Sequence, residues 1–300
     1  MNKIKIESAL LLGILAVIWG SSFILMKKGL LAYSAPQVAS MRIFISGLVF
    51  LPYIIKNFQT IPWNKITPII IFALLEIGIP PFLYTYAQIH VDSSSAGILN
   101  CLVPLFTLSI GFLMFRLKYH FLTTLGVIIG LGGAGIITFM KSSGGTNASF
   151  DFGNWWGLLI ILATVMYGAA GNILKEYLNN LSSIMLTALA FVTMAIPAGF
   201  YLLISDTFSL PFGETQHLHS FLAILVLSLF GSALAILLFS KLTKMSNALY
   251  ASFVTYLIPF VSLLWGWLDG ENISFIHLIS MVVIFFGIYV ANLGENRNNN

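Results

Sequence analysis

Charged residues are scarce in this sequence of 300 residues. They make up 8% of the chain, whereas an ordinary soluble domain carries about 25%. Hydrophobic residues make up 58%. A chain of this composition cannot cover itself with polar surface, so we expect lipid to be its outer solvent.

Cysteine is nearly absent as well. The single residue, Cys101, excludes a disulfide framework. It lies in an apolar run with no histidine near it, so we expect a buried thiol and not a nucleophile. The five histidines lie in predicted loops or outer helical turns without the spacing of a metal site. We therefore predict no metal and no cofactor.

One motif at first suggests a dinucleotide site. The stretch GVIIGLGGAGIITF contains Gly130, Gly132 and Gly135 in the spacing G-x-G-x-x-G, which binds pyrophosphate only at a strand-to-helix turn of a soluble domain. Here the motif lies inside a long apolar run, so we expect no dinucleotide to bind. Gly126, Gly130 and Ala134 instead place small residues on one helical stripe, which lets a neighbouring helix approach closely in lipid.

Long apolar runs recur along the chain at the length that crosses a bilayer, about 20 residues. The first begins after MNKIKIE and continues to Met26 with no small-residue cleavage site. We interpret it as a retained helix and not as a secretory signal. The predicted fold class is all-α integral membrane, with ten transmembrane helices at residues 8–28, 36–55, 67–89, 93–115, 121–140, 155–174, 183–204, 219–240, 247–268 and 275–293.

The basic residues indicate how the chain is oriented. With the N-terminus in the cytoplasm, Lys27, Lys28 and Lys141 fall outside and Arg42 stays within a helix. The others fall inside, and this positive-inside bias predicts that both termini are cytoplasmic. The formal charge of +4 therefore reflects topology, and we predict no nucleic-acid partner. The residues inside are Lys3, Lys5, Lys56, Lys65, Arg116, Lys118, Lys175, Lys241, Lys244 and Arg297.

A polar, glycine-rich stretch, KSSGGTNASFDFGN, separates two sets of five predicted helices. Aligning the fourth and ninth helices without gaps pairs Pro104 with Pro259 and Arg116 with Glu271. Because each set has an odd number of helices, the second must enter the membrane upside down, as in the inverted repeats of secondary transporters. Arg116 and Glu271 then carry opposite charges on opposite sides, which supports the inversion. We predict a first repeat at 1–141, a linker at 142–153, a second repeat at 154–294 and a polar tail at 295–300.

Four stretches carry a family resemblance: AVIWGSSF, QVASMRIF with its arginine, YTYAQIHVDSSSAGILNCLVPLF and ALYASFVTYLIPFVSLLWGWLDGENIS. Together they resemble the EamA-type family of the drug/metabolite transporter superfamily, over nearly the whole chain. The resemblance implies two inverted five-helix repeats in a bacterial cytoplasmic membrane, and transport of small metabolites or amino acids, most often outward. Family members usually have a glutamate after the proline-bearing helix of each half, as Glu271 is here, whereas the first half has Arg116.

Glu76 is the main candidate for a functional group within the membrane. It lies near the midplane of the third predicted helix, where ionisable groups are costly and suggest function. Pro80 and Pro81 remove the helical hydrogen bonds to the carbonyls of Glu76 and Ile77. We favour a site for a proton, a cation or a substrate ammonium. The alternative is a protonated glutamate bonded to a neighbouring helix.

Other candidates for substrate binding or coupling are polar or aromatic. Pro104 and Pro259 free the carbonyls of Asn100 and Thr255, although a structural kink explains these prolines equally well. Arg42 could pair with a carboxylate or attract an anionic substrate, but we favour snorkelling to the interface. The predicted site thus comprises Glu76, Asn100 and Thr255, the aromatic residues Trp19, Tyr84 and Tyr256, and Asn172, which alternatively only joins helices.

We predict a secondary membrane transporter of small metabolites, an exporter of amino acids or related compounds that works by alternating access, and no enzyme. Its partners are a small-molecule substrate and the lipid bilayer, while proton coupling and a homodimer are left open. An integral-membrane enzyme is one alternative, but it needs converging catalytic residues at one depth. A non-transporting assembly subunit is the other, and it leaves the inverted repeats and broken helices unexplained.

Overall fold

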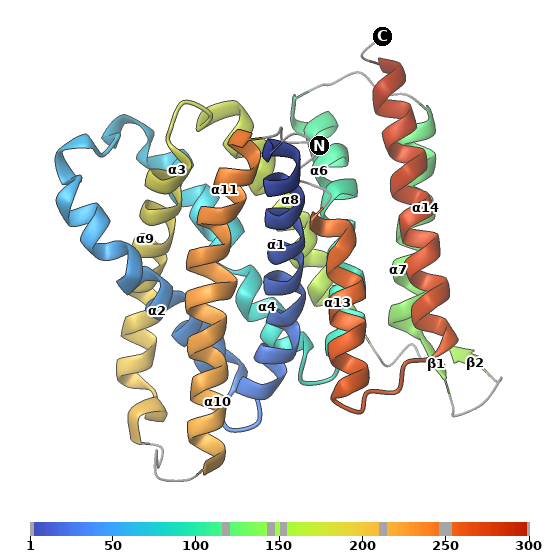
Figure 1. Cartoon of the computed structure of the whole chain (residues 1–300), viewed down its shortest axis with the longest axis horizontal. Helices are drawn as coiled ribbons and strands as arrows, with labels where there is room; N and C mark the ends of the chain where they lie inside the picture. Colours follow the sequence, from blue (N-terminus) through green and yellow to red (C-terminus); the bar gives the residue numbers. More distant parts are fainter. Residues whose placement is uncertain are drawn as a thin grey trace.

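The computed structural model describes residues 3–115, 121–142, 148–150, 155–209, 215–245 and 254–298. These residues form a bundle of helices (Figure 1). Within them, eight helical segments are long and apolar enough to cross a membrane, and the two shorter apolar helices Val254–Leu268 and Phe275–Ala291 accompany them. The predicted helical membrane protein is confirmed at this level.

The helices follow the predicted apolar runs closely. In chain order they are α1 (Lys3–Gly29), α2 (Ala35–Lys56), α3 (Ile66–Ala73), α4 (Pro80–Ala87), α5 (Ser93–Leu99), α6 (Val103–Phe115), α7 (Phe121–Phe139), α8 (Gly157–Tyr177), α9 (Ser183–Ile204), α10 (Thr215–Val226), α11 (Ala235–Met245), α13 (Val254–Leu268) and α14 (Phe275–Asn298). Short 3₁₀ segments lie at Phe58–Thr60, Trp63–Lys65, Asn100–Leu102 (η4) and Asp206–Ser209. Two segments are π-helical, η3 (Leu74–Gly78) and η6 (Leu227–Leu234).

Two of the membrane-spanning segments are therefore interrupted helices. α3, η3 and α4 lie in the span Trp63–Ala87, while α10, η6 and the start of α11 lie in the span Thr215–Phe239. Both spans are 25 residues long. In the first span, Pro80 and Pro81 account for the break because neither has an N–H to donate to an earlier turn. Sequence periodicity predicts that these runs are helical but does not distinguish α- from π-helical turns.

Within the described residues, a short β-hairpin departs from the all-α prediction. β1 (Met140–Ser142) and β2 (Ala148–Phe150) pair antiparallel, with Met140 opposite Phe150. The predicted linker at 142–153 overlaps β2, while residues 143–147 and 151–154 lie outside the described residues. The pairing gives backbone groups hydrogen-bond partners where the chain leaves α7.

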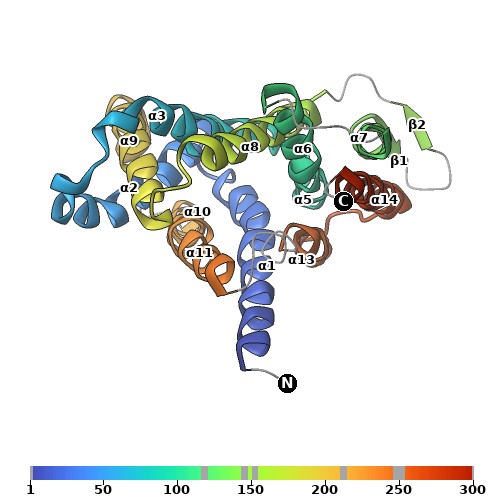
Figure 2. The same cartoon turned by 90° about the horizontal axis from the view of Figure 1, so that it is seen from above.

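Close helix packing lies at one edge of the molecule, where α7 runs beside α14 (Figures 1 and 2). A Cβ added to Gly126 would lie 2.3 Å from the backbone nitrogen of Ala291 and 2.4 Å from the carbonyl oxygen of Gly287. The predicted close approach through Gly126 and Gly130 is confirmed, since Gly287 also abuts the Gly130 nitrogen. Ala134 is buried too. At the opposite edge, α2 packs along α9.

Candidate functional site

Glu76 lies in the middle of an interrupted helix. It is part of η3, and it sits near the centre of the span Trp63–Ala87. The Ile79 N–H donates to the Leu74 carbonyl at 2.9 Å, which is π-helical spacing. The residues four and five positions after Glu76 are both prolines, so neither α- nor π-helical bonding supplies a donor for its carbonyl. Such π-helical turns are rare and are frequent at functional sites.

The Glu76 carboxyl group has no bonded partner within the described residues. It is partly exposed, and no hydrogen bond or ion pair joins it to another described side chain. Tyr167, on α8, lies close enough to interact with it electrostatically. The alternative prediction was that the Glu76 side chain bonds to a neighbouring helix. The described residues contain no such bond. An unpaired carboxyl group at this depth suits proton exchange or cation binding.

Tyr84, Asn100 and Tyr167 form a polar and aromatic cluster around this position. The Tyr84 hydroxyl, on α4, donates to Asn100 Oδ1 at 2.8 Å. The Tyr84 ring lies 6.2 Å from the Tyr167 ring and 5.9 Å from the Phe23 ring, measured between centroids. Tyr84 is buried, while Asn100 and Tyr167 are partly exposed. Two of the predicted site residues, Glu76 and Tyr84, thus lie near Tyr167, and a third, Asn100, is bonded to Tyr84.

Side chains from the first half of the chain donate hydrogen bonds to the second π-helical segment, η6. Trp19 Nε1, on α1, donates to the Gly231 carbonyl at 3.2 Å. Arg42 Nε, on α2, donates to Ser232 Oγ at 3.0 Å, and Arg42 interacts electrostatically with Tyr84 and Tyr167. The favoured interpretation that Arg42 snorkels to the interface is therefore wrong. A buried hydroxyl on a facing helix offers its guanidinium an acceptor inside the bundle.

The two prolines predicted to free carbonyls have different outcomes. After Asn100 the chain forms the 3₁₀ segment η4, and the Val103 N–H donates to the Asn100 carbonyl. The expectation that the Asn100 carbonyl is free is therefore wrong, because a tighter turn supplies the donor that Pro104 lacks. The Thr255 carbonyl instead accepts a hydrogen bond from Cys101 Sγ at 3.2 Å. Cys101 is a buried, free thiol, as predicted.

The remaining predicted residues, Asn172, Tyr256 and Thr255, have partners outside this cluster. Asn172, on α8, donates through Nδ2 to the Thr107 carbonyl at 2.9 Å and to the Gly168 carbonyl at 2.8 Å, so it joins α8 to α6. Its Oδ1 is the part of the amide left for a ligand. Tyr256 is partly buried and packs edge-on against Phe285, with ring centroids 6.2 Å apart. Thr255 is partly buried beside it.

Two members of this region, Tyr167 and Ser232, are not among the predicted site residues. The signal for Tyr167 is its residue type, because an aromatic side chain within an apolar run can line a substrate cavity. Ser232 is one small polar residue in a long apolar run and has no comparable local signal. Its importance follows only from the bond to Arg42, 190 positions away in the chain.

A second polar cluster lies where α1 ends. The carboxylate of Glu271, in the loop between α13 and α14, accepts a hydrogen bond from Lys27 Nζ at 2.7 Å. It also accepts bonds from the backbone N–H and hydroxyl groups of Ser93 and Ser94 at the start of α5. Asp269 pairs with Lys27 at 2.8 Å and with Lys28. We call this group the Glu271 cluster; it ties α1 to α5 and to the α13–α14 loop.

Local backbone geometry directs Glu271 toward α5. α13 ends in a Schellman motif, in which the Gly270 N–H donates to the Trp267 carbonyl and the Glu271 N–H donates to the Gly266 carbonyl at 2.8 Å. Gly270 has φ 79°, a left-handed conformation that glycine adopts without strain. A Cβ on Gly266 would overlap Ser94 Oγ and the Glu271 carboxylate. These two glycines therefore permit the contact between Glu271 and α5.

The charges of the Glu271 cluster stabilise one another. Burial alone would raise the pKa of Glu271, but hydrogen bonds from Lys27, Ser94 and Ser93 outweigh it and lower the pKa from its ordinary value. The pKa of Asp269 is likewise lowered, because its bonds to Lys27 and Lys28 outweigh its burial. At neighbouring Asp92, burial and the charge of Glu271 raise the pKa. Glu271 therefore stabilises the fold mainly in its ionised form.

Replacing Glu271 by alanine is expected to lower the free energy of unfolding by about 3–5 kcal/mol at neutral pH, because Lys27 and two backbone N–H groups lose a mostly buried acceptor. Since the folded pKa of Glu271 is lowered, its contribution is present above about pH 4.5 and decreases as the pH falls below that value. The variant should lack this acid-dependent decrease. Thermal unfolding of the purified protein, followed from about pH 7 down to about pH 3, measures both effects.

The matched control for Glu271→Ala is Glu7→Ala. Glu7 pairs with Lys241 at 2.7 Å, but both side chains are about half exposed. Removing an exposed ion pair should cost less than about 1 kcal/mol. Equal losses of stability in the two variants would contradict the expectation that the buried Glu271 contributes more to the free energy of unfolding than the exposed Glu7.

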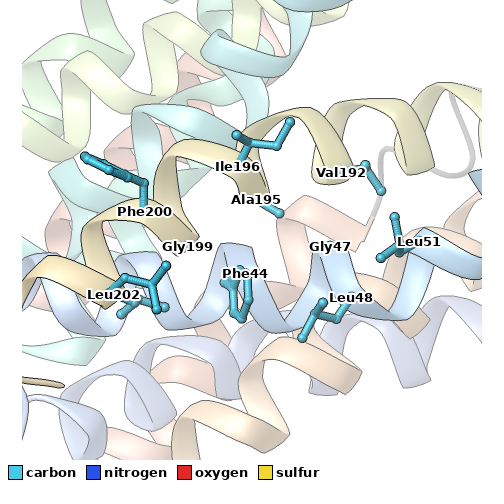
Figure 3. A pocket seen from close by; sticks show the side chains of 11 residues that line it. Phe44, Gly47, Leu48, Leu51, Val192, Ala195, Ile196, Gly199, Phe200 and Leu202 are labelled. Atoms are coloured by element: carbon cyan, nitrogen blue, oxygen red, sulfur yellow. The ribbon is translucent and has the colours of Figure 1, made fainter. Parts of the chain in front are cut away.

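An apolar groove of about 400 Å³ lies between α2 and α9 and shares no residue with either cluster (Figure 3). Phe44, Leu48, Ile196 and Phe200 are among the side chains that line it, and the last three are exposed. The lining has no ionisable side chain. An apolar groove on the outer edge of a membrane bundle suits lipid chains, so the candidate site lies at Glu76 and its neighbours and not in this groove.

A sequence profile of the EamA-like transporter family matches residues 7–139 and 154–293. The chain belongs to this family. Membership confirms the resemblance noted in the sequence and the transmembrane character of the helices. The general role of this EamA-like protein is transport of a small-molecule substrate across a lipid bilayer.

Several relatives of this EamA-like chain are named as transporters. It is 30% identical over 288 residues to the uncharacterized inner membrane transporter YedA of Escherichia coli K12, covering 94% of this chain and 89% of YedA. It is 26% identical over 266 residues to the uncharacterized transporter YvbV of Bacillus subtilis, covering 86% and 82%. A WAT1-related chloroplastic protein of Arabidopsis thaliana is 26% identical over 93% of this chain and 68% of its own length. These names favour transport over enzymatic activity.

The same fold occurs among solved structures. One crystal structure matches 98% of this chain and 99% of its own chain, with a TM-score of 0.64 and 15% sequence identity. At this identity the match concerns the fold alone.

Proposed function

We propose that this protein is a secondary transporter that exports small metabolites, amino acids or related compounds, by alternating access. The observation that carries the proposal is Glu76: a carboxyl group near the middle of a membrane span, on a π-helical turn before two prolines, with no bonded partner within the described residues. Broken helices with polar groups near the membrane centre are typical of transporter sites.

Within this proposal the residues have distinct roles. Glu76 exchanges a proton or binds a cationic group of the substrate. Tyr84 and Asn100 hold each other through their hydrogen bond and offer the remaining polar atoms to the substrate. Trp19, Tyr256, Thr255 and the free Oδ1 of Asn172 line the path on the neighbouring helices.

Contacts between helices support two inverted repeats of five helices. α7 packs on α14 and α2 on α9, which pairs the fifth helices and the second helices of the two halves. α1 packs on α13, so the first helix of the first half contacts the fourth helix of the second half. α8 packs on α6, which is the same contact with the two halves swapped. The π-helical segments also occupy similar places in two spans of equal length. We therefore propose repeats at 1–141 and 154–294, a linker at 142–153 and a tail at 295–300.

In an alternating-access mechanism, the Glu271 cluster would hold one end of the bundle closed. The cluster joins α1 and α5 of the first repeat to the α13–α14 loop of the second. If the two repeats move relative to one another, this end of the bundle opens only when those bonds break. The cluster then favours the conformation in which its end is closed.

We further propose that the protein lies in a bacterial cytoplasmic membrane with both termini in the cytoplasm. α1 begins and α14 ends at the same end of the bundle, as an even number of crossings requires (Figure 1). The basic residues of the predicted cytoplasmic loops support that side. The name of YedA as an inner membrane transporter supports the membrane. A homodimer stays a prediction.

Single engineered cysteines test this orientation. Cys101 is 1% exposed, so it should react little by itself. In intact cells we expect Ser143→Cys, in the linker outside the described residues, to react with a membrane-impermeant thiol reagent. Lys241→Cys, at an exposed position on α11, should react only after the membrane is permeabilised. The reverse pattern would contradict the proposed orientation.

Transport by purified protein in proteoliposomes tests the proposed function. The liposomes are loaded with labelled amino acids and small metabolites, and the release of each compound is compared with that from protein-free liposomes. We expect at least one compound to cross only when the protein is present, and unlabelled compound on the other side to accelerate its exchange. A correctly inserted and folded protein that moves none of the panel would contradict the proposal.

A further inference from the structure

Arg42 is a cation inside the bundle whose charge is not balanced by a described carboxylate. It lies seven residues into the span Ala35–Lys56, about 10 Å along the helix from its first residue. The ion pairs among the described residues use Lys27, Lys28 and Lys241, and none uses Arg42. Its side chain is partly exposed. A guanidinium at this depth is costly unless water or an anion compensates it.

One hydrogen bond orients the guanidinium and leaves its terminal nitrogens available. Nε donates to Ser232 Oγ at 3.0 Å, and Ser232 is buried on η6. A guanidinium has five N–H donors, so the four on the two terminal nitrogens have no acceptor within the described residues. Because Nε is engaged, an anion has to approach from the Nη1–Nη2 edge. That edge matches the two oxygens of a carboxylate.

The neighbours of Arg42 indicate what else the anion carries. Tyr84 and Tyr167 lie close enough to Arg42 to interact electrostatically, and their rings are 6.2 Å apart. Glu76 is the other charged neighbour of Tyr167. The remaining basic residues of the described spans lie near the helix ends, so Arg42 offers a single positive charge at this depth. One positive charge suits a carboxylate better than a doubly charged phosphate.

We propose that Arg42 binds the carboxylate of the transported compound through its two terminal nitrogens, with the body of that compound against Tyr84 and Tyr167. This inference rests on the proposed transport function and assigns its specificity. Ser232 is a positioning residue, because it acts by holding Nε. Glu76 remains available for an ammonium group when the compound has one.

Paired ligands test the proposal. The probes are carboxylic acids and their carboxamides with the same carbon skeleton, drawn from amino acids and from aromatic and short-chain acids. Thermal stabilisation and proteoliposome exchange are measured for wild type, Arg42→Gln, Arg42→Lys and Ser232→Ala. We expect wild type to bind at least one carboxylate and to bind its amide at least about tenfold more weakly. Arg42→Gln should weaken carboxylate binding by about tenfold to hundredfold and leave amide binding unchanged.

The other variants separate charge from geometry. Arg42→Lys keeps the charge but cannot bind a carboxylate in bidentate fashion, so it should fall between wild type and Arg42→Gln. Ser232→Ala should weaken carboxylate binding less than Arg42→Gln does. Lys241→Gln removes an exposed cation on α11 and should leave the binding of both carboxylates and carboxamides unchanged. If Arg42→Gln does not fold, the proposal is tested by the carboxylate affinities of the other proteins. Arg42→Lys and Ser232→Ala should both bind the carboxylate more weakly than wild type, and equal affinities would overturn the proposal.

The outcomes distinguish this inference from the proposed function. If wild type binds amides as tightly as acids, or binds no carboxylate of the panel, Arg42 is not the carboxylate site. The same conclusion follows if Arg42→Gln keeps the wild-type preference. A wild type that transports a compound lacking any carboxylate overturns this inference while leaving the transport function intact. A wild type that transports nothing overturns the transport function itself.

Discussion

Replacing Glu76 by glutamine is expected to abolish the dependence of transport on a pH gradient while leaving the protein folded. The carboxyl group lies on a π-helical turn within the span Trp63–Ala87 and is unpaired within the described residues. A carboxyl group at this depth avoids much of the cost of burying charge by taking up a proton. It can release that proton when the site opens to water on one side and regain one on the other. Glutamine keeps the shape but cannot titrate.

The size of the effect follows from the energy in the gradient. With one proton exchanged per substrate, a gradient of one pH unit supports an accumulation of about tenfold. Wild-type protein in proteoliposomes should approach this ratio, and Glu76→Gln should reach no accumulation above equilibration. Exchange of substrate down its own gradient should survive if Glu76 carries the proton and not the substrate. The assay compares accumulation with and without an imposed pH gradient.

Glu176→Gln is the matched control, because this glutamate is exposed at the end of α8. It should accumulate substrate as wild type does. Full gradient-driven accumulation by Glu76→Gln would identify Glu76 as a structural residue, and coupling would then lie elsewhere or be absent.

Gly126→Ala is expected to destabilise the protein strongly, whereas Gly132→Ala is not. A Cβ at position 126 would lie 2.3 Å from the Ala291 nitrogen and 2.4 Å from the Gly287 oxygen, so α7 and α14 would have to separate. Overpacking of this kind costs about 1–3 kcal/mol or more, and here the obstacle is backbone, which cannot rotate away. A Cβ at position 132 would meet nothing within 4 Å. There, alanine should be neutral or should stabilise α7 by up to about 1 kcal/mol.

Thermal unfolding of the two variants in the same detergent measures this difference. Both changes add one methyl group to the same helix, so the change in helix propensity is matched. Gly130→Leu should also destabilise, because the added group meets Leu105 Cδ1 at 2.2 Å, although that side chain can move. A Gly126→Ala protein as stable as Gly132→Ala would contradict the close packing of α7 on α14. Stoichiometric dinucleotide in the purified wild-type protein would contradict the structural interpretation of these glycines.

Local chemistry made the region around Glu76 predictable. A proline removes a donor at a known distance along the chain, so the broken helix and its carboxyl group could be inferred without knowing any neighbour. The same reasoning was incomplete at Asn100, where a 3₁₀ turn through Val103 supplies the missing donor. Whether a chain relaxes in this way depends on how its next helix packs, which the proline itself does not specify.

The partner of Arg42, in contrast, could not be predicted from local sequence. The place of Arg42 near the end of an apolar run favoured snorkelling, since a long side chain usually reaches the interface. The acceptor that holds it, Ser232, lies 190 positions later on a helix that packs against α2. The bond between Tyr84 and Asn100, within one half of the chain, likewise depends on how two helices are rotated.

The sequence by itself determined that this is a helical membrane protein of the EamA-like family, with small residues where α7 meets α14 and a carboxyl group on a broken helix. These properties follow from composition and from local backbone chemistry, because lipid requires every span to be apolar and to satisfy its own hydrogen bonds. Only the tertiary structure decided that Arg42 points to Ser232, that Tyr167 joins Glu76 to Tyr84, and that Glu271 reaches the start of α5. Such contacts depend on the rotation and depth of each helix against its neighbours, and an apolar run of residues is nearly the same on every face.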